Sequence, residues 1–93
     1  MLELQVDRVL HAIADPTRRS IVERISRADA LSATALVPTL DVSLAAVVQH
    51  LKILEECGVI RTEKVGRVRK LRLRPEALIL VEQWLRDLSL IHI

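Results

Sequence analysis

Aromatic side chains are nearly absent from this chain of 93 residues: it has no Phe or Tyr and a single tryptophan, Trp84. Proteins that bind single-stranded nucleic acid by stacking its bases need several aromatic platforms, so that mode of binding is excluded. Cysteine is equally scarce. Because Cys57 stands alone, we expect no internal disulfide and no zinc site built from several cysteines.

Glycine and proline are also rare, with two and three residues, which excludes collagen-like and low-complexity chains. The sequence has no uncharged apolar run of about 18 residues, the length of a membrane span, and no signal-peptide pattern. Apolar residues make up 51% of the chain, which argues against disorder. We therefore expect one cytoplasmic domain over residues 1–93, without membrane association.

Features typical of enzymes are missing as well. The chain has no glycine-rich phosphate-binding loop and no convincing pair of nucleophile and base, and its three histidines are scattered. We expect no catalytic residues and no enzymatic activity.

Positive charge is concentrated in one segment, although the net charge of the whole chain is only +2. Between Arg61 and Arg74 there are seven basic residues and one acid, Glu63, whereas the rest of the chain holds seven basic and eleven acidic residues. A basic segment on an otherwise acidic protein is typical of a polyanion-binding surface. The alternative interpretation is a solvated strand pair with a charged edge.

The first and last helices are predicted from apolar stripes at helical spacing. The stripe residues are Leu2, Val6, Val9, Leu10 and Ile13 in the first helix, and Leu78, Val81, Leu85 and Leu88 in the last, which begins at Pro75. Together these stripes exceed what one face of a small core absorbs. Our hypothesis is that they form the isologous interface of a homodimer.

Capping residues delimit three helices between these two. Asp15 as N-cap and Pro16 at the first helical position begin a helix that runs to about residue 26. Ser32 caps a short helix over about residues 33–37, and Ser43 caps a fourth that ends near residue 57, where Gly58 is suited to terminate it.

The fourth helix is predicted to have one apolar and one polar side. Its predicted inward residues are Leu44, Val47, Leu51 and Leu54, and its predicted outward residues are Ala45, Gln49, Lys52 and Glu56. The side chains on the N-terminal half of the outer side are then small or polar, so this part of the helix can approach a groove closely.

A hairpin follows Gly58, because the apolar period changes from 3.6 to 2. Strands over about residues 59–65 and 68–73 flank Gly66 and Arg67, a two-residue connection that suits a type II′ turn. Pairing Val65 with Val68 fixes the register. One face of the hairpin is then apolar at its base, with Ile60, Leu71 and Leu73, and basic at its tip. The tip carries Lys64, Arg67 and Arg69.

The order of these elements predicts the fold class: mainly α with a small β-hairpin, a winged helix-turn-helix arranged α-α-α-α-β-β-α. In this fold the fourth helix lies in the major groove of double-stranded DNA, and the hairpin is the wing. The helix face and the basic tip are weak indications separately, but they occur together in the correct order.

The sequence also resembles the ArsR-type winged-helix transcriptional repressors from about Val9 to Leu85. The resemblance is carried by Ala14-Asp15-Pro16-Thr17-Arg18-Arg19, Val47-Val48-Gln49-His50-Leu51-Lys52-Ile53-Leu54, Cys57-Gly58-Val59-Ile60, Gly66-Arg67 and Leu71-Arg72-Leu73. It implies a homodimeric repressor, joined through its first and last helices, that binds a palindromic operator. Where the family frequently has a serine, this chain has Val48, so one hydroxyl contact to DNA is missing.

The resemblance also implies which residues contact DNA. These are Ser43, Leu44, Ala45, Gln49, His50 and Lys52 of the fourth helix, with Lys64, Arg67 and Arg69 of the wing. Gln suits a bidentate contact to adenine, and Lys suits guanine or phosphate. For His50 a local hydrogen bond at the edge of the helix is an equal alternative, and for Arg18 an internal ion pair with Asp15 or Glu23 is preferred to a phosphate contact.

Metal sensing, which occurs in the family, is not expected here. The stretch that corresponds to the family's Cys-x-Cys pair, residues 33–37, has no ligand, and the last helix has no histidine before His92. Cys57 is expected to be a small buried hydrophobe. We predict no metal and no cofactor, and the residues do not indicate a small-molecule effector.

The alternative function is a winged-helix module that binds another protein through its wing or its apolar stripes, without specific DNA binding. Salt distinguishes the two, since a DNA-binding protein releases counterions and loses affinity steeply as salt rises.

Overall fold

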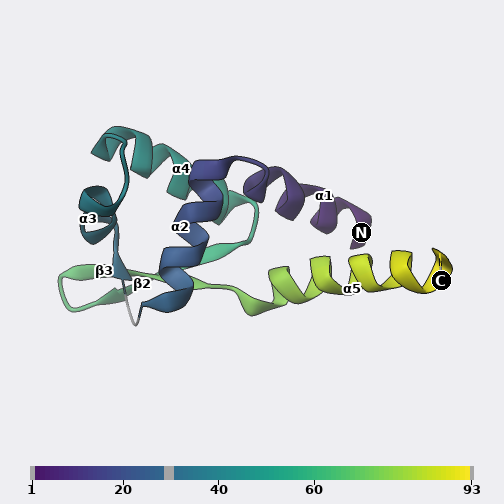
Figure 1. The fold of residues 1–93 in the computed structure, drawn as a ribbon. Helices are drawn as coiled ribbons and strands as arrows, with labels where there is room; N and C mark the ends of the chain where they lie inside the picture. The colour runs from purple at the N-terminus through teal and green to yellow at the C-terminus, as the bar shows by residue number, and fades with distance from the viewer. Residues whose placement is uncertain (1, 29–30, 93) are drawn as a thin grey trace.

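The computed structural model describes the backbone of residues 2–28 and 31–92 and the side chains of residues 5–28 and 31–89. Figure 1 shows the elements in chain order: α1 (Leu2–Ile13), α2 (Pro16–Arg27), β1 (Leu31–Ser32), α3 (Ala33–Leu36), the 3-10 turn η1 (Val37–Thr39), α4 (Leu44–Glu56), β2 (Ile60–Val65), β3 (Val68–Leu73) and α5 (Pro75–His92). The predicted fold class is confirmed: the chain is mainly helical and has a winged helix-turn-helix order.

The core is formed where α2, α3, α4 and the base of the hairpin meet. Ile21, Leu36, Val47 and Leu54 are fully buried there, and Ile60 closes the core from β2. These residues come from four elements, α2, α3, α4 and β2. Burying them together therefore fixes the angle between α3 and α4 and the direction in which the hairpin leaves the body.

Two of the predicted N-caps begin the first two helices after α1. The Asp15 carboxylate accepts a hydrogen bond from the Arg18 backbone N–H at 2.9 Å, and the Ser32 hydroxyl accepts one from Ala35 N–H at 3.3 Å. A third N-cap, Ser43, accepts from Ala46 N–H at 3.2 Å.

Helix α4 ends at the predicted glycine. Gly58 has φ +79°, a left-handed conformation that favours glycine. Its N–H donates to Glu55 O at 3.0 Å, and Val59 N–H donates to Leu54 O at 2.9 Å. This pair of bonds is a Schellman motif, which satisfies the last carbonyls of the helix and turns the chain into β2.

The sheet contains one strand more than the sequence predicts, with the strand order β1-β3-β2. The hairpin register is as predicted, with Val65 opposite Val68, and Gly66 has the positive φ, +64°, that primed two-residue turns require. The extra strand, β1, pairs Leu31 with Leu71. Two residues have no period, so only the pairing with β3 defines them as a strand.

The partners of Arg18 differ from those predicted. Its side chain is internal and only 9% exposed, but among the described residues it forms neither of the expected ion pairs, with Asp15 or with Glu23; only its backbone N–H donates to Asp15. Instead its guanidinium donates to the last carbonyls of α1, through Nε to Ala12 O at 2.6 Å and through Nη2 to His11 O at 3.1 Å. It therefore ties the end of α1 to the start of α2.

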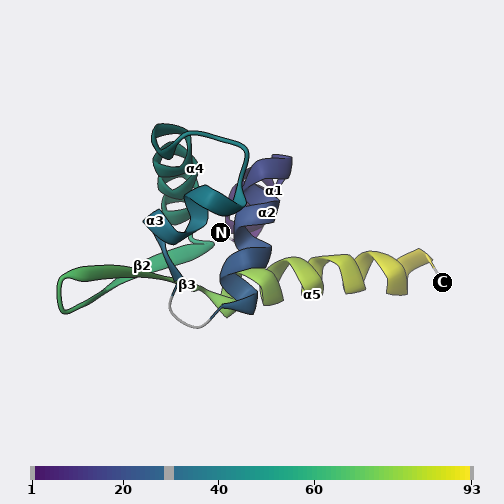
Figure 2. The same ribbon diagram turned by 60° about the vertical axis from the view of Figure 1, so that its left-hand side comes forward.

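The molecule is elongated, with extents of 48 × 27 × 22 Å. The hairpin and α5 extend from the body in opposite directions, and the outer half of α5, which holds the C-terminus, extends beyond the other helices (Figure 2). By itself, none of the described helices is long and apolar enough to cross a membrane. A sharply bent pair, Ala33–Thr39 with Leu44–Glu56, meets that test by length and composition only.

Candidate nucleic-acid interface

The outer side of α4 is more apolar than the sequence predicts. Gln49, Lys52 and Ala45 are exposed, as expected, but Leu44, which was predicted to lie inward, is 49% exposed. Val48 is 54% exposed, one turn further along. Leu44 lies in the first turn of the helix, beyond the edge of the core that covers Val47 and Leu54, so its helical position does not bury it.

The helix-turn-helix is held by a side chain that the sequence analysis did not single out. Arg24 of α2 donates through Nη2 to Thr39 O at 2.8 Å, at the end of η1. The Thr39 hydroxyl in turn donates to Leu36 O at 2.6 Å. These bonds fix the turn between α3 and α4 against α2. No periodic pattern identifies Arg24, because its partner lies in another element.

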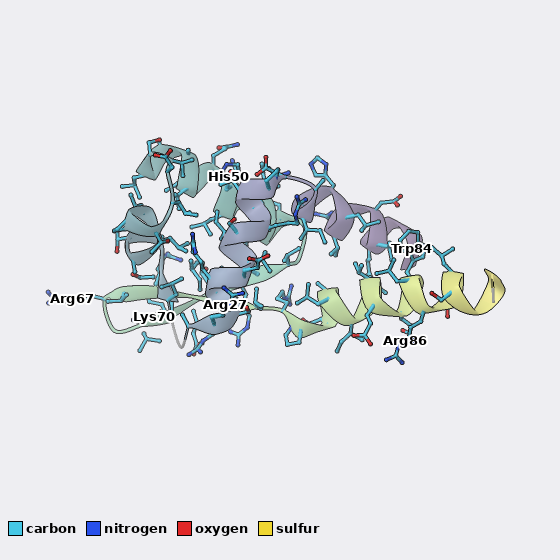
Figure 3. The ribbon with its side chains drawn as sticks, viewed as in Figure 1. Arg27, His50, Arg67, Lys70, Trp84 and Arg86 are labelled. Carbon is cyan, nitrogen blue, oxygen red and sulfur yellow. The ribbon has the colours of Figure 1, made fainter. Side chains whose placement is uncertain are left out.

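His50 is half-buried and lies on α4, where Figure 3 labels it. Its Nδ1 is buried and has no hydrogen-bond partner in the described part of the chain. The pKa of Asp15 is lowered, chiefly by the hydrogen bond from Arg18 N–H; desolvation opposes this shift, and the charges of Arg18 and His50 add to it. His50 therefore lies at the edge of the exposed side of α4, with its Nδ1 shielded from solvent.

The positive charges of the wing differ between its base, where several are ion-paired, and its tip. At the base, the Glu63 carboxylate lies 3.2 Å from Arg72 Nε and 3.8 Å from Arg61 Nη1, and Arg74 pairs with Glu76 at 3.3 Å. Glu63 is opposite Lys70 in the register, as predicted, but its ion pairs are with the arginines.

The tip has no such neutralisation. Lys64, Arg67 and Arg69 are exposed, and among the described residues no carboxylate forms an ion pair with them. Figure 3 shows Arg67 pointing away from the body at the end of the hairpin, with Arg86 at the other end of the molecule. The tip is therefore the part of the wing where uncompensated positive charge meets solvent.

The residues predicted for a dimer interface have unequal exposure. Val6, Val9 and Val81 are already buried within the single chain, and Leu10, Ile13 and Leu78 are half-buried. Leu85 is 52% exposed, whereas the side chain of Leu2 lies outside the described residues. The helices α1 and α5 pack on one another, which explains why the inner residues of both stripes are covered.

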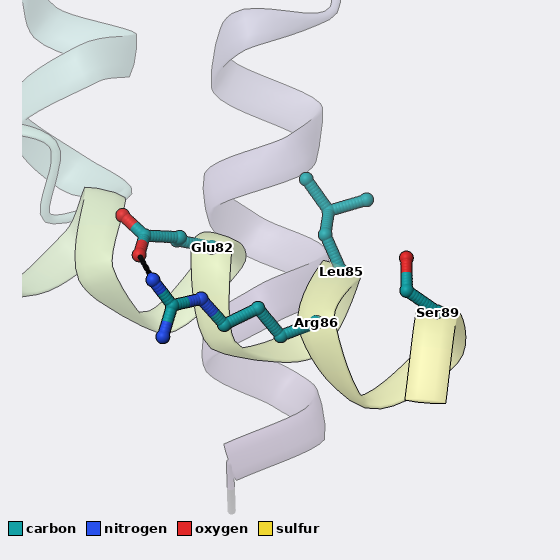
Figure 4. A pocket seen from close by; sticks show the side chains of 4 residues that line it. All are labelled: Glu82, Leu85, Arg86 and Ser89. Atoms are coloured by element: carbon teal, nitrogen blue, oxygen red, sulfur yellow. Dashed lines mark ion pairs between the residues drawn. The ribbon is translucent and has the colours of Figure 1, made fainter. Parts of the chain in front are cut away.

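The exposed part of α5 includes a shallow groove of about 440 Å³ lined by Glu82, Leu85, Arg86 and Ser89 (Figure 4). Glu82 and Arg86 form an ion pair of 3.0 Å along one side of it. Trp84 and Leu88 are also exposed on this helix. The outer half of α5 therefore presents apolar surface that the chain does not cover.

Within the described residues, no three His, Cys, Asp or Glu side chains are placed to hold a metal ion. Cys57 is half-buried at the edge of the core. It lines a second groove, of about 560 Å³, between α1, the end of α4 and the start of α5. Arg8 crosses toward this region and donates to Glu56 O.

A family model described as a helix-turn-helix domain matches residues 13–63, from the end of α1 into β2. The HTH-type transcriptional regulator Rv2034 of Mycobacterium tuberculosis is 40% identical over 72 residues, which are 77% of this chain and 66% of that protein. The chain therefore spans just under two thirds of the length of that relative.

Solved structures agree with the sequence comparison. An ArsR family transcriptional regulator superposes with a TM-score of 0.83 at 36% identity, covering 94% of this chain and 89% of that one. An ArsR-like transcriptional regulator from Rhodococcus sp. RHA1 superposes with a TM-score of 0.82 at 33% identity, covering 91% and 79%. The chain belongs to the ArsR-type helix-turn-helix family of DNA-binding transcriptional regulators, which are not enzymes.

Proposed function

We propose that this protein is a sequence-specific repressor that binds double-stranded DNA as a homodimer on a palindromic operator. It acts as a single domain over residues 1–93 in the cytoplasm. The observation that carries the proposal is the free positive charge of Lys64, Arg67 and Arg69 on the wing, in the same chain as an exposed α4 face. Repression is inferred from the resemblance of the sequence motifs to ArsR-type repressors.

In this proposal α4 enters the major groove and the wing contacts phosphates or the minor groove. Gln49 and Lys52 are exposed on the outer side of α4 and have the donors and acceptors that recognise base edges. Ser43, the N-cap, keeps its hydroxyl hydrogen available to a phosphate, and Ala45 leaves room for close approach. His50 contributes at the edge of the contact, through the part of its ring that remains exposed.

The test is fluorescence anisotropy of the full chain with the duplex that lies just upstream of its own gene, with a scrambled duplex as competitor, at about 50 and 200 mM salt. We expect tight binding that prefers the upstream duplex and weakens steeply with salt. Weak binding without preference to any duplex at either salt concentration would contradict the proposal.

Two alanine variants test the role of the wing tip. Arg67→Ala removes a free charge at the tip, and we expect roughly tenfold weaker binding and a salt dependence shallower by about one phosphate contact per protomer. Arg74→Ala is the matched control, since it removes the same charge from the same basic segment, where Glu76 already neutralises it. Equal losses in the two variants would contradict a specific role for the tip.

A protein-interaction module is the second candidate, and the exposure of Val65 at 50% and Val68 at 42% on the wing favours it. Apolar contacts of that kind bind with little dependence on salt. The salt series therefore separates the two candidates.

A further inference from the structure

Leu44 and Val48 form an apolar pair on the exposed side of α4. They are four residues apart, so they lie on one side of the helix, one turn from each other. Each exposes about half of its side chain, 49% for Leu44 and 54% for Val48. Large apolar side chains this exposed gain little from folding, so their place on this helix needs another explanation.

The core does not need this pair. At about 100° per residue, Val48 lies about 60° from the buried Leu51, on the exposed arc that also holds Lys52. Leu44 lies only about 20° from Leu51, but it is in the first turn of α4, where the core does not cover it. Neither Leu44 nor Val48 belongs to the buried cluster or to the apolar residues packed against it.

Charge around the pair indicates which partner covers it. Lys52 and Gln49 lie beside Val48 on the exposed side, whereas the carboxylates of this helix, Glu55 and Glu56, are confined to its last turn. The acid-free N-terminal half also has the positive end of the helix dipole. This environment suits a polyanion with apolar groups at its surface better than an apolar protein surface.

In the major groove of DNA, the apolar group presented by a base is the C5-methyl group of thymine. We propose that Leu44 and Val48 are specificity-determining residues that contact thymine methyl groups, so each operator half-site has thymines where α4 enters the groove. This inference rests on the proposed function and adds a class of base to it. Residues four apart are separated by about 6 Å along the helix, and successive bases by about 3.4 Å, so the two contacts fall one or two base steps apart.

The experiment uses the full chain and begins by selecting duplexes from a randomised pool. Thymines of the selected duplex are then replaced by deoxyuridine, one symmetric pair at a time, which removes the methyl group and keeps the base pair. We expect one or two positions in each half-site where affinity falls about fourfold for each methyl lost. Unchanged affinity at every thymine, or a selected site without thymine, would overturn the inference, although enrichment itself would leave the proposed function intact.

Protein variants assign the contact to the pair. In Val48→Ser and Leu44→Ser, the deoxyuridine substitution at the matching position should no longer weaken binding, because the methyl partner is gone. Gln49→Ala is the control: it weakens binding to both duplexes and keeps the full penalty for deoxyuridine. If both serine variants keep that penalty, the methyl groups are recognised elsewhere and the inference fails. If the pool yields no enriched duplex, both the proposed function and this inference fail.

Discussion

Arg18 is a charged residue that the core depends on. Its two hydrogen bonds satisfy the Ala12 and His11 carbonyls at the end of α1, and replacing it leaves buried acceptors without donors. We expect Arg18→Met to lower the free energy of unfolding by about 2–3 kcal/mol, measured by urea denaturation.

Arg19 provides the matched control for this prediction. Its Nη1 also donates to carbonyls at the same corner, Ile13 O and Ala14 O, both at 2.8 Å, but the side chain is exposed and water replaces it. Arg19→Met is therefore expected to cost less than about 1 kcal/mol. Equal losses in the two variants would show that burial does not set the contribution of Arg18.

Asp15 makes part of the stability dependent on pH. Its pKa is lowered from the ordinary value of 3.8, chiefly by the hydrogen bond from Arg18 N–H. A lowered pKa in the folded state means that this contribution is fully present above pH 3.8 and is lost as the pH falls through the lower value. We expect the stability difference between the native chain and Asp15→Asn, which keeps the cap without titrating, to shrink in that range.

The check on Asp15 is a set of urea midpoints for both chains between neutral pH and pH below 3.8. Other carboxylates titrate in both proteins and cancel in the comparison. A difference that does not change with pH would contradict the role of this carboxylate.

Among the secondary-structure elements, the wing depends on Gly66. A β-carbon built on it meets nothing within 4 Å, so the cost of substitution comes from its φ of +64° alone. We expect Gly66→Ala to destabilise the fold by about 1 kcal/mol and Gly66→Asn by less, since asparagine tolerates this conformation better. Thermal unfolding of both variants checks the order, and an equal or larger loss for asparagine would contradict it.

At the scale of the whole molecule, the outer half of α5 is the surface through which we expect the chain to dimerise. Trp84, Leu85 and Leu88 expose apolar surface there, and our proposal covers it with a second copy of the chain. We expect a dimer at micromolar concentration by sedimentation, and a monomer for Leu85→Glu, because burying a carboxylate without a partner is costly.

Val65→Glu is the control for the dimer. Val65 is as exposed as Leu85, at 50% against 52%, but it lies on the wing at the other end of the molecule, so its substitution should leave the sedimentation unchanged. A native chain that sediments as a monomer would contradict the dimer.

The sequence by itself determined the features that depend on neighbouring residues. The caps at Asp15, Ser32 and Ser43, the helix end at Gly58 and the hairpin register around Gly66 follow from local hydrogen bonds and backbone preference. The apolar periods predicted the helices because residues at that spacing share one side of a helix, which is read directly from the sequence. The order of these elements was enough to indicate the winged helix-turn-helix.

Only the tertiary structure decided the features that depend on contacts between distant residues. It paired Leu31 with Leu71, gave Arg18 the carbonyls of α1 in place of an ion pair with Asp15 or Glu23, and buried Nδ1 of His50. It also left Leu44 at the surface, although its helical spacing matches the buried residues. A period states which residues share a side of a helix, but how far the core extends along that side depends on the other elements packed against it.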